Sequence, residues 1–384
     1  MNFDLTAAQK EIKKDLGLWL KEEAEVLEAL SQQDPKGLEA AHRSFLKKLA
    51  RKDYYFQVGL NPEEARKNPF ADILNWIFLG EELAKVSPSL FMALECSTRL
   101  FGWLIARYGH ESHLQELLNP LQQGLLLGAL AMDESSRNFP GQEVLTIGQK
   151  EGEGYRVNGH KKQVINAPVA DWLAVTGKVE GQWAVFLVKA DREGLLKGEP
   201  QRTFGFDGLG LSNITFNQCL VPQEQILGLF SRPDFLTELR TRTNLILTVA
   251  SLGIMDRALQ GAKHYVSETP DGSKPLRAYQ SISFKLAEMF TLWQTSQWMV
   301  YRTAWMLETR AAGAETMAAA TKVFVTEAAE TVAKEAMQIM AGEGVLAGHI
   351  IEECYRDARF GPVFGETSEV LRMKIADDCL GKYK

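Results

Sequence analysis

The spacing of apolar residues changes twice along the chain, and this feature constrains the fold more than any other. From residue 5 to about residue 107 apolar side chains recur every three or four positions, which predicts helices. Between about residues 125 and 229 short alternating runs are separated by Gly, Asn and Asp, which predicts an antiparallel β domain. Helical spacing then returns. We therefore predict an α+β protein with an N-terminal helical domain (1–124), a middle β domain (125–232) and a C-terminal helical bundle (233–384).

Local signals predict where several helices begin and end. Ser87 is suited to cap a helix that has Pro88 at its first position, where the missing N–H costs nothing. Gly342 and Gly344 are expected to stop the last of the long bundle helices, and Thr269–Pro275 separates the first two. The periodicity places these long helices at 245–266, 281–309 and 319–340.

The charge pattern argues against some classes of partner. The formal net charge is −6 and no run of Lys and Arg is interleaved with aromatic residues, so we expect no nucleic-acid partner. Charges and glycines interrupt the apolar stretches before the roughly 20 residues that a membrane-spanning helix needs. Asp4 stands where an export signal carries basic residues. We expect a cytoplasmic protein without a membrane span.

The four cysteines, Cys96, Cys219, Cys354 and Cys379, are widely scattered. They have neither CxxC spacing nor a companion His at metal-ligand spacing. We therefore expect buried or free thiols, with no disulfide framework and no metal site.

Four segments resemble acyl-CoA dehydrogenases in the same order along the chain. The resemblance covers nearly the whole sequence and implies the helical, β, helical architecture of that superfamily. The segments are YRVNGHKKQVINAPVADW (155–172), YQSISFKLAEM (279–289), QIMAGEGV (338–345) and YRDARFGPVFGETSEVLRMKIA (355–376).

The resemblance implies a cofactor, a substrate and partners. FAD would lie between the β domain and the C-terminal bundle, with a fatty acyl-CoA thioester against its ring. A carboxylate would remove the α-proton of the thioester while the β-hydride passes to the flavin. The resemblance also implies a homo-oligomer (dimer or tetramer) or a heteromer with a paralogue, and electron-transfer flavoprotein as the acceptor of an active enzyme.

The position of the usual catalytic base is altered in this chain. In the family the base is the Glu of a Tyr-Glu-Gly-Thr run, and the same register here reads Phe364, Gly365, Glu366 and Thr367. Gly365 therefore occupies the base position, and Glu366, one residue later, is the candidate base. The alternative is that Glu366 is a carboxylate near the start of the last helix, capped by Thr367 or Ser368.

Some family members place the base on the first long helix of the bundle instead. Alignment through Gly253 brings Thr243 to that position, so no carboxylate is present there either. The Arg that commonly follows corresponds to Asn244. Arg240 and Arg242 lie nearby. They either substitute for that Arg, if the start of the helix is displaced, or are surface charges, and we favour surface charges.

The flavin-facing β motif is partly retained. The family pattern Gly-x-Lys-x-aromatic-Ile-Thr-Asn lacks its aromatic residue and its Thr hydroxyl here. By resemblance, Gln163, Ile165 and Asn166 would contact the flavin. The matching positions are Gly159, Lys161, Gln163, Val164, Ile165 and Asn166.

A second flavin loop of the family, Thr-Glu-Pro-Gly-x-Gly-Ser-Asp, corresponds to residues 133–140. This implies that Asp133 lies near the cofactor. Only Glu134 survives unchanged, and Arg137 either pairs with an anion or lies in solvent.

Further cofactor candidates lie in the C-terminal third. Each has a structural alternative, namely a helix cap, a polar flank or a helix end. The Arg and Phe of the family's Arg-x-x-Phe-Gly linker are missing from 269–273. The candidates are Gln280, Gln338, Gly342 and Thr367.

Arg356, Asp357 and Arg359 resemble the family's Arg-Asp-Ala-Arg run. Their spacing suits pairs within a helix and between elements. We predict a structural ion-pair network.

Three functions fit these observations. The first is an FAD-dependent acyl-CoA dehydrogenase with an unusual base that forms 2,3-enoyl-CoA. The second is a non-catalytic or half-site subunit that pairs with an active paralogue. The third is a flavin-dependent oxidase or monooxygenase on the same fold. We favour the first.

Overall fold

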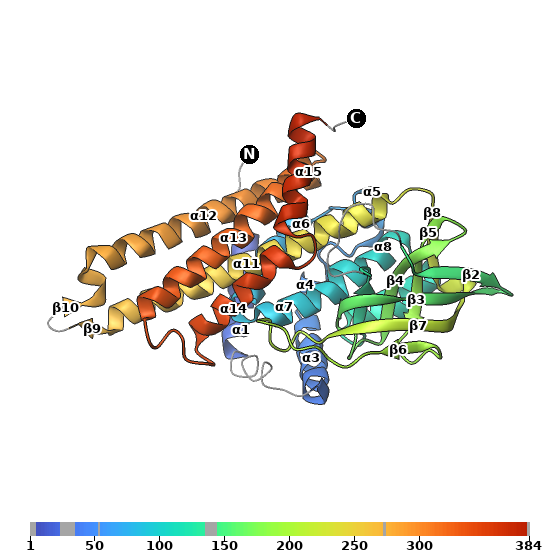
Figure 1. The fold of residues 1–384 in the computed structure, drawn as a ribbon, viewed down its shortest axis with the longest axis horizontal. Coiled ribbons are helices and arrows are strands. Elements are labelled where there is room, and N and C mark those ends of the chain that lie inside the picture. Colours follow the sequence, from blue (N-terminus) through green and yellow to red (C-terminus); the bar gives the residue numbers. More distant parts are fainter. Residues whose placement is uncertain (1–4, 24–34, 53, 135–143, 272–273, 382–384) are drawn as a thin grey trace.

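The computed structural model describes residues 5–23, 35–52, 54–134, 144–271 and 274–381. N-terminal helices, a β sheet and a C-terminal helical bundle follow one another along the chain (Figure 1). The predicted α+β architecture is therefore confirmed.

The N-terminal part is helical up to Gln122. The predicted cap is confirmed, because the Ser87 hydroxyl accepts a hydrogen bond from the Leu90 N–H at 3.3 Å and Pro88 is the first residue of its helix. The helices are α1 (Ala7–Glu22), α3 (Pro35–Ala50), α4 (Tyr54–Gln57), α5 (Pro62–Lys67), α6 (Ile73–Val86), α7 (Pro88–Glu95), the π-helical η2 (Cys96–Gly102), α8 (Trp103–Tyr108), α9 (Glu111–His113), η3 (Leu114–Leu118) and α10 (Asn119–Gln122).

The middle part is one sheet with strand order β6-β7-β3-β2-β4-β5-β8, and β1 pairs with β4. Most pairs are antiparallel as predicted, but β4 runs parallel to β1 and to β2. Parallel neighbours need a crossover, and the β2–β3 hairpin lies between β1 and β4 in the chain. The strands are β1 (Gly128–Ala131), β2 (Ile147–Glu151), β3 (Gly154–Ile165), β4 (Trp172–Val179), β5 (Gln182–Lys189), β6 (Leu195–Lys197), β7 (Leu211–Pro222) and β8 (Ile226–Phe230).

The C-terminal part is a bundle of long helices. The first begins at Asp234, earlier than the predicted residue 245, and α13 ends at Met340, just before Gly342 as predicted. The Thr269–Pro275 break contains two short paired strands, β9 (Pro270–Asp271) and β10 (Lys274–Pro275). The helices are α11 (Asp234–Glu268), α12 (Gln280–Glu308), α13 (Ala314–Met340), α14 (Ile350–Val363) and α15 (Ser368–Leu380).

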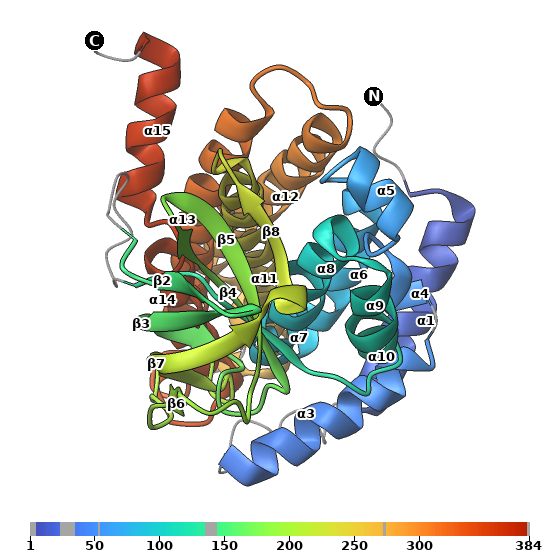
Figure 2. The same cartoon turned by 90° about the vertical axis from the view of Figure 1, so that its right-hand side faces the viewer.

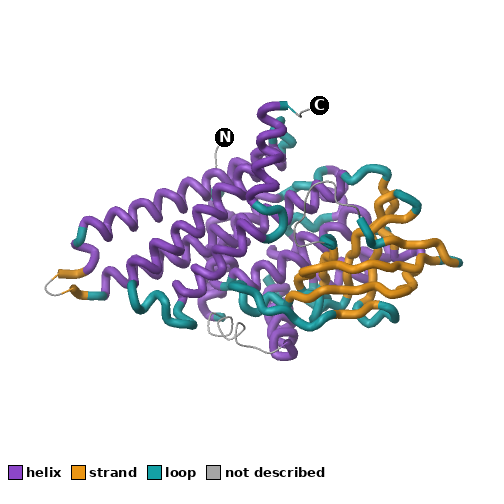
Figure 3. Tube along the Cα trace, in the orientation of Figure 1, coloured by secondary structure: helices purple, strands orange, loops and turns teal. Residues whose placement is uncertain are grey.

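Helix α11 lies at the centre of the molecule and connects the parts. It packs on α6 so closely that a Cβ added to Gly253 would lie 2.4 Å from the Ala84 carbonyl carbon, so only glycine fits there. One apolar core is continuous through the N-terminal helices and the bundle, and a second fills the β domain. Figure 3 shows the strands gathered at one end of the molecule and the long helices extending away from them, and Figure 2 views the molecule from that end, with the strands toward the viewer.

Two helical stretches have the length and apolar composition of a membrane span, namely Pro88–Tyr108 and Asp234–Glu268. The prediction that no apolar stretch reaches this length is therefore wrong. Their most apolar windows are 100% and 83% buried within the protein. Such burial is typical of the core helices of a globular fold.

Candidate functional site

A small cavity lies where the β domain meets the helices. The β domain supplies residues at the ends of β1 and β3, and the opposite wall comes from α7, η2, α11 and the segment after α14. The β wall consists of Leu130, Met132, Asp133, Lys162, Gln163 and Ile165, and the helical wall of Met92, Cys96, Leu100, Thr243, Ile246 and Phe364. This is the place where the resemblance puts the flavin ring and the thioester.

The cavity is narrow in this structure. Its enclosed volume is about 50 Å³, whereas pockets for organic ligands begin at roughly 300 Å³. A flavin ring and an acyl group fit the apolar chemistry of the two walls, but flexible side chains such as Met92, Met132 and Phe364 must turn aside to admit them.

The two positions at which the family places its base meet beside this cavity, since Thr243 lines it and Gly365 directly follows the lining residue Phe364. Gly365 has a left-handed φ of +65°, and a Cβ built on it would lie 3.4 Å from Thr243 Cγ2 and 3.3 Å from Leu247 Cδ1. The register deduced for Gly365 and Thr243 therefore brings them together in space. Neither carries a carboxylate, and the atoms nearest the Gly365 Cβ position are two methyl groups and, at 3.8 Å, the Asn244 amide oxygen, so this point is uncharged and mostly apolar.

Glu366 points to partners outside the cavity lining. Only 5% of this residue is exposed, and its carboxylate accepts a hydrogen bond from Asn244 Nδ2 at 2.9 Å and another from Lys374 Nζ. Burial raises its pKa, but Lys374, Arg240 and Asn244 outweigh that effect and lower it overall. Glu366 as the base stays a prediction, and this geometry favours a held, ionised carboxylate.

Thr367 caps α15, which was the structural alternative for this position. Its hydroxyl accepts a hydrogen bond from the Val370 N–H at 3.4 Å. A contact with flavin stays a prediction.

Lys322, on α13, fixes the segment that contains Gly365. Its fully buried Nζ donates to the carbonyl oxygens of Phe364, at 3.0 Å, and of Glu366. Burial lowers its pKa to about 7, although Glu366 and Glu369 act in the opposite direction. Sequence reasoning missed this residue, because a single Lys within a helix resembles any surface charge.

The two arginines near Thr243 differ from each other. The interpretation of Arg242 as a surface charge is wrong: it is 5% exposed, with its guanidinium 4.4 Å from the centre of the Trp103 ring and beside Phe70. Burial and the neighbouring Arg99 lower its pKa to about 9. Arg240 instead lies at the cavity rim, 3.7 Å from the Glu366 carboxylate and 3.8 Å from Asp133.

The flavin-motif candidates on β3 take three different positions. Ile165 is buried and lines the cavity, and Gln163 lines its outer, exposed part. Asn166 is fully buried with a left-handed φ of +65°, and its Nδ2 donates to the Ala93 carbonyl at 2.7 Å. Asn166 therefore fastens β3 to α7. Contact of these residues with a flavin stays a prediction.

Glu134 supports the β wall from behind. Its carboxylate forms an ion pair with buried Lys161 at 2.8 Å and accepts hydrogen bonds from the Leu145 and Thr146 N–H groups. The remainder of the predicted loop, 135–140 with Arg137, lies outside the described residues, as do Gly272 and Ser273 of the linker.

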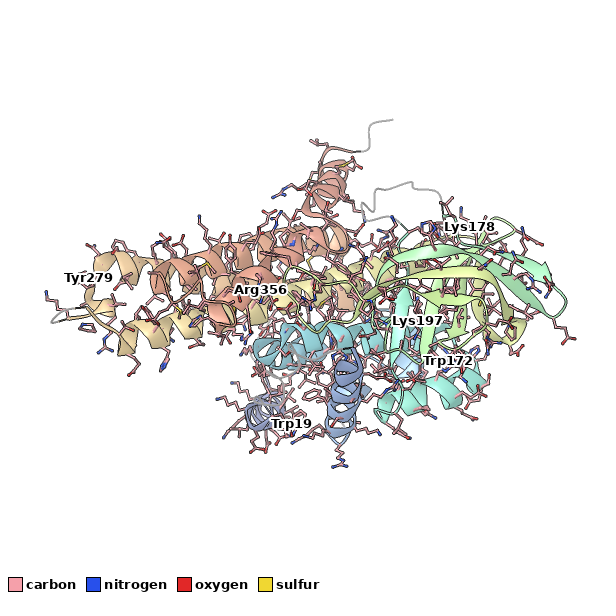
Figure 4. The ribbon with its side chains drawn as sticks, turned by 60° about the horizontal axis from the view of Figure 1, so that its bottom comes forward. Trp19, Trp172, Lys178, Lys197, Tyr279 and Arg356 are labelled. Atoms are coloured by element: carbon pink, nitrogen blue, oxygen red, sulfur yellow. The ribbon has the colours of Figure 1, made fainter. Side chains whose placement is uncertain are left out.

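The candidates Gln280, Gln338 and Gly342 lie far from the cavity. They are exposed at the end of the bundle where α12 begins and α13 ends. In Figure 4, Tyr279, the neighbour of Gln280, lies at the opposite end of the molecule from Trp172 and Lys178 of the β domain. One chain does not bring these two groups of candidates together.

The predicted ion-pair network around α14 is confirmed for Arg356 and Arg359, whereas buried Asp357 instead accepts a hydrogen bond from the Phe206 N–H. Arg356 pairs with Asp207 at 2.6 Å and with Glu352, and Arg359 pairs with Glu330 at 2.7 Å. This network holds a β-domain loop against the bundle.

The cysteines have no disulfide partners. Cys96, Cys219 and Cys354 are buried and Cys379 is exposed. In the part of the chain that the structure describes, no group of three or more His, Cys, Asp and Glu residues is placed to hold a metal ion. Cys96 lines the cavity, which the sequence did not indicate.

Comparison with known proteins identifies the family. The acyl-CoA dehydrogenase middle domain matches residues 129–219, and the acyl-CoA dehydrogenase C-terminal domain matches residues 241–380. The chain belongs to the acyl-CoA dehydrogenase family. Family members include FAD-dependent CH–CH oxidoreductases, and solved homologues bind FAD.

Individual relatives cover nearly the whole chain. Benzylmalonyl-CoA dehydrogenase of Aromatoleum aromaticum is 27% identical over 386 residues, which cover 98% of this chain and 99% of that protein. Caffeyl-CoA reductase-Etf complex subunit CarC of Acetobacterium woodii is 26% identical over 318 residues, 81% of this chain and 83% of that protein. The structure of butyryl-CoA dehydrogenase from Megasphaera elsdenii has a TM-score of 0.85 at 25% identity and covers 99% of this chain and 100% of that one.

Proposed function

We propose that this acyl-CoA dehydrogenase family member uses FAD to oxidise an acyl-CoA thioester to the 2,3-enoyl-CoA. We further propose that its substrate carries a carboxylate on Cα that leaves as CO₂. The observation that carries this proposal is the contact between Gly365 and Thr243, which leaves both base positions without a carboxylate.

A base is needed only when Cα must lose a proton. In a 2-carboxyacyl thioester, the bond between Cα and the carboxylate can break instead, and its electron pair becomes the Cα=Cβ bond. FAD, when bound, accepts the hydride that leaves Cβ. The products are CO₂ and the enoyl thioester, and no protein group takes a proton.

The cavity wall suits this reaction. A Cβ at Gly365 would meet the Leu247 and Thr243 methyl groups at 3.3 and 3.4 Å and Asn244 Oδ1 at 3.8 Å, so the surroundings of this position are mostly apolar, with one amide acceptor. A carboxylate loses its charge as it becomes CO₂, so apolar surroundings destabilise it more than they destabilise the developing neutral product. This differential effect lowers the barrier to decarboxylation.

The names of two relatives support the substrate class. Benzylmalonyl-CoA is a 2-carboxyacyl thioester, and both benzylmalonyl-CoA and caffeyl-CoA carry an aromatic acyl group. We therefore propose an aryl-substituted 2-carboxyacyl-CoA for this chain, with electron-transfer flavoprotein as the electron acceptor.

The decisive test uses the purified, FAD-loaded protein without oxygen. Benzylmalonyl-CoA labelled with ¹³C in its free carboxylate is expected to bleach the flavin and release one labelled CO₂ per flavin reduced. The matched control is 3-phenylpropionyl-CoA, which lacks only that carboxylate and is expected to leave the flavin oxidised. Bleaching by the control at an equal rate would refute the decarboxylating route.

We also propose that the working form is a homo-oligomer. From Thr243 to the far end of α11 is roughly 40 Å at 1.5 Å per residue, longer than one extended dinucleotide. Gln280 and Gln338 therefore reach a cofactor only when it is bound by a second copy. Exposed apolar side chains on α12 provide a surface for such contact, namely Phe284 (59% exposed), Phe290 (51%) and Trp298 (47%).

Light scattering tests this assembly. The wild-type protein is expected to have the mass of a dimer or tetramer, and Phe290→Glu is expected to shift the mass toward the monomer. A monomeric wild-type protein that still retains FAD would contradict the shared arrangement.

A second function is favoured by a different observation. Ile165 occupies the place of the flavin-facing Thr and lines the cavity as an apolar residue, which suits a non-catalytic subunit that pairs with an active paralogue. The visible spectrum separates the two functions, since a catalytic subunit is expected to hold stoichiometric FAD after reconstitution. Absence of FAD after reconstitution would support the partner subunit.

A further inference from the structure

We propose that Arg240 determines specificity by binding the carboxylate on Cα of the substrate. This inference rests on the proposed function, because it assigns a recognition group to a substrate class that the proposed function requires. It concerns a residue for which the sequence analysis favoured a surface charge.

Arg240 is correctly placed for this role. It lies on α11 one helical turn before Thr243, so the two side chains share a face of the helix. Its two guanidinium amino groups lie near Asp133 on the β wall and near Glu366, the residue that follows Gly365. The guanidinium therefore spans the rim of the cavity beside the space left by the missing base.

The present partners of Arg240 leave it able to bind another anion. Its ion-pair distances are 3.7 and 3.8 Å, longer than the 2.7–3.2 Å of direct hydrogen bonds. Its side chain is 28% exposed. Within the described residues its guanidinium is in ion pairs with two carboxylates but in no hydrogen bond, so its planar N–H groups can still make the bidentate contacts that carboxylates favour.

The local charge balance favours an additional carboxylate. Arg240, Lys374 and Lys162 contribute three positive charges around the rim, and Asp133 and Glu366 contribute two negative ones. The formal charges of these five described side chains sum to one positive charge. A substrate carboxylate completes the balance, whereas an acyl group without it does not.

Rim binding and apolar burial have different effects on the substrate. Arg240 lies at the cavity edge, and the wall at Gly365 is apolar. The cation therefore selects and draws in the carboxylate, and the apolar wall promotes its loss. Substitution of Arg240 should act mainly on binding.

The test compares two thioesters that contain the same CoA. Phenylmalonyl-CoA carries the carboxylate and phenylacetyl-CoA lacks it, and neither has a hydrogen on a saturated Cβ, so neither can be oxidised. Titration calorimetry of the FAD-loaded protein is expected to show that Arg240→Gln weakens phenylmalonyl-CoA binding by about tenfold or more, the loss of one charge-assisted contact. Binding of phenylacetyl-CoA is expected to change less than about twofold, a free-energy change under 0.5 kcal/mol.

Controls separate this inference from the proposed function. Arg359→Gln removes an exposed guanidinium from outside the cavity and is expected to leave both affinities unchanged. Equal weakening of both thioesters by Arg240→Gln would mean that Arg240 binds the CoA phosphates, and no weakening of either would mean that it binds no part of the ligand. Either result overturns the assignment, even if benzylmalonyl-CoA still releases CO₂. Loss of CO₂ release in the wild-type protein would instead overturn the proposed function.

Discussion

Gly365 and Thr243 lie against each other, with the Cβ direction of Gly365 aimed at the Thr243 methyl group 3.4 Å away. They are the two places where family members carry the base, one before the last helix and the other on α11. Because they meet beside the cavity, we expect a carboxylate installed at either place to face the same ligand atoms. Thr243 is the better site for such a change, since a side chain at Gly365 would be strained at a φ of +65°.

Thr243→Glu is therefore expected to create a dehydrogenase for plain acyl-CoA. The new carboxylate can remove the α-proton, and positioned general bases typically accelerate such steps by about 10²- to 10⁴-fold. The measurement is the anaerobic rate of flavin bleaching by 3-phenylpropionyl-CoA, compared with the isosteric but non-basic Thr243→Gln. Equal rates in the two variants would show that the Thr243 position does not face Cα.

Glu366→Gln is expected to weaken the fold more than the chemistry. The variant leaves the cations of Arg240 and Lys374 without their nearly buried partner, which typically costs about 1 to 3 kcal/mol of the free energy of unfolding. Urea denaturation measures this loss, with exposed Glu369→Gln as the control. If Glu366 were the base, the variant would instead lose about 3 to 5 kcal/mol of transition-state stabilisation. Turnover would then fall while the free energy of unfolding stayed unchanged.

Lys322 is expected to make stability depend on pH above neutrality. Burial lowers its pKa from 10.5 to about 7, so between these values the unfolded chain binds more protons than the folded protein. Stability therefore rises with pH across this window, and the cost of burying the charged amine is fully present below pH 7. The urea midpoint of the wild-type protein relative to Lys322→Met should increase from pH 7 to pH 9. A constant difference would show that the amine stays charged throughout.

His42 is expected to weaken the protein in acid. It is 1% exposed, its Nδ1 has no partner among the described residues, and burial lowers its pKa from 6.5 to about 4. The unfolded chain therefore binds the extra proton first, and stability is lost as pH falls from 6.5 through 4. His42→Leu should lower the difference in melting temperature between pH 7.5 and pH 5.0. The exposed His264→Leu serves as the control, and an equal effect in both variants would argue against His42 as the source.

Periodicity predicted the elements, and motif register identified the two base positions without predicting that they touch. A single helix or strand imposes its own spacing, so the order of the three parts, the Ser87 cap and the end of α13 could be deduced locally. The parallel pairing of β1 with β4 could not, because it depends on which distant strands become neighbours.

The sequence could not predict the side-chain partners within the site either, because most of these partners also come from distant segments of the chain. Arg242 is buried because Phe70 and Trp103, from the N-terminal helices, enclose it. Glu366 is held by Asn244 and Lys374, which lie on two different helices. Neither environment leaves a pattern in the residues that flank these side chains. Charge suggested exposure for Arg242, and motif register left Glu366 as either a base or a carboxylate at the start of the last helix.

The close contact between Gly253 and Ala84 also sets the geometry of the cavity. Helix α11 is a single 35-residue helix that carries both Gly253 and Thr243. A side chain at Gly253 would push helix α11 away from α6. Arg240, Thr243 and Asn244 would then move together relative to the β wall of the cavity. A packing contact in the core thus sets the alignment of these groups, roughly 14 Å along the helix from Asn244, the nearest of them.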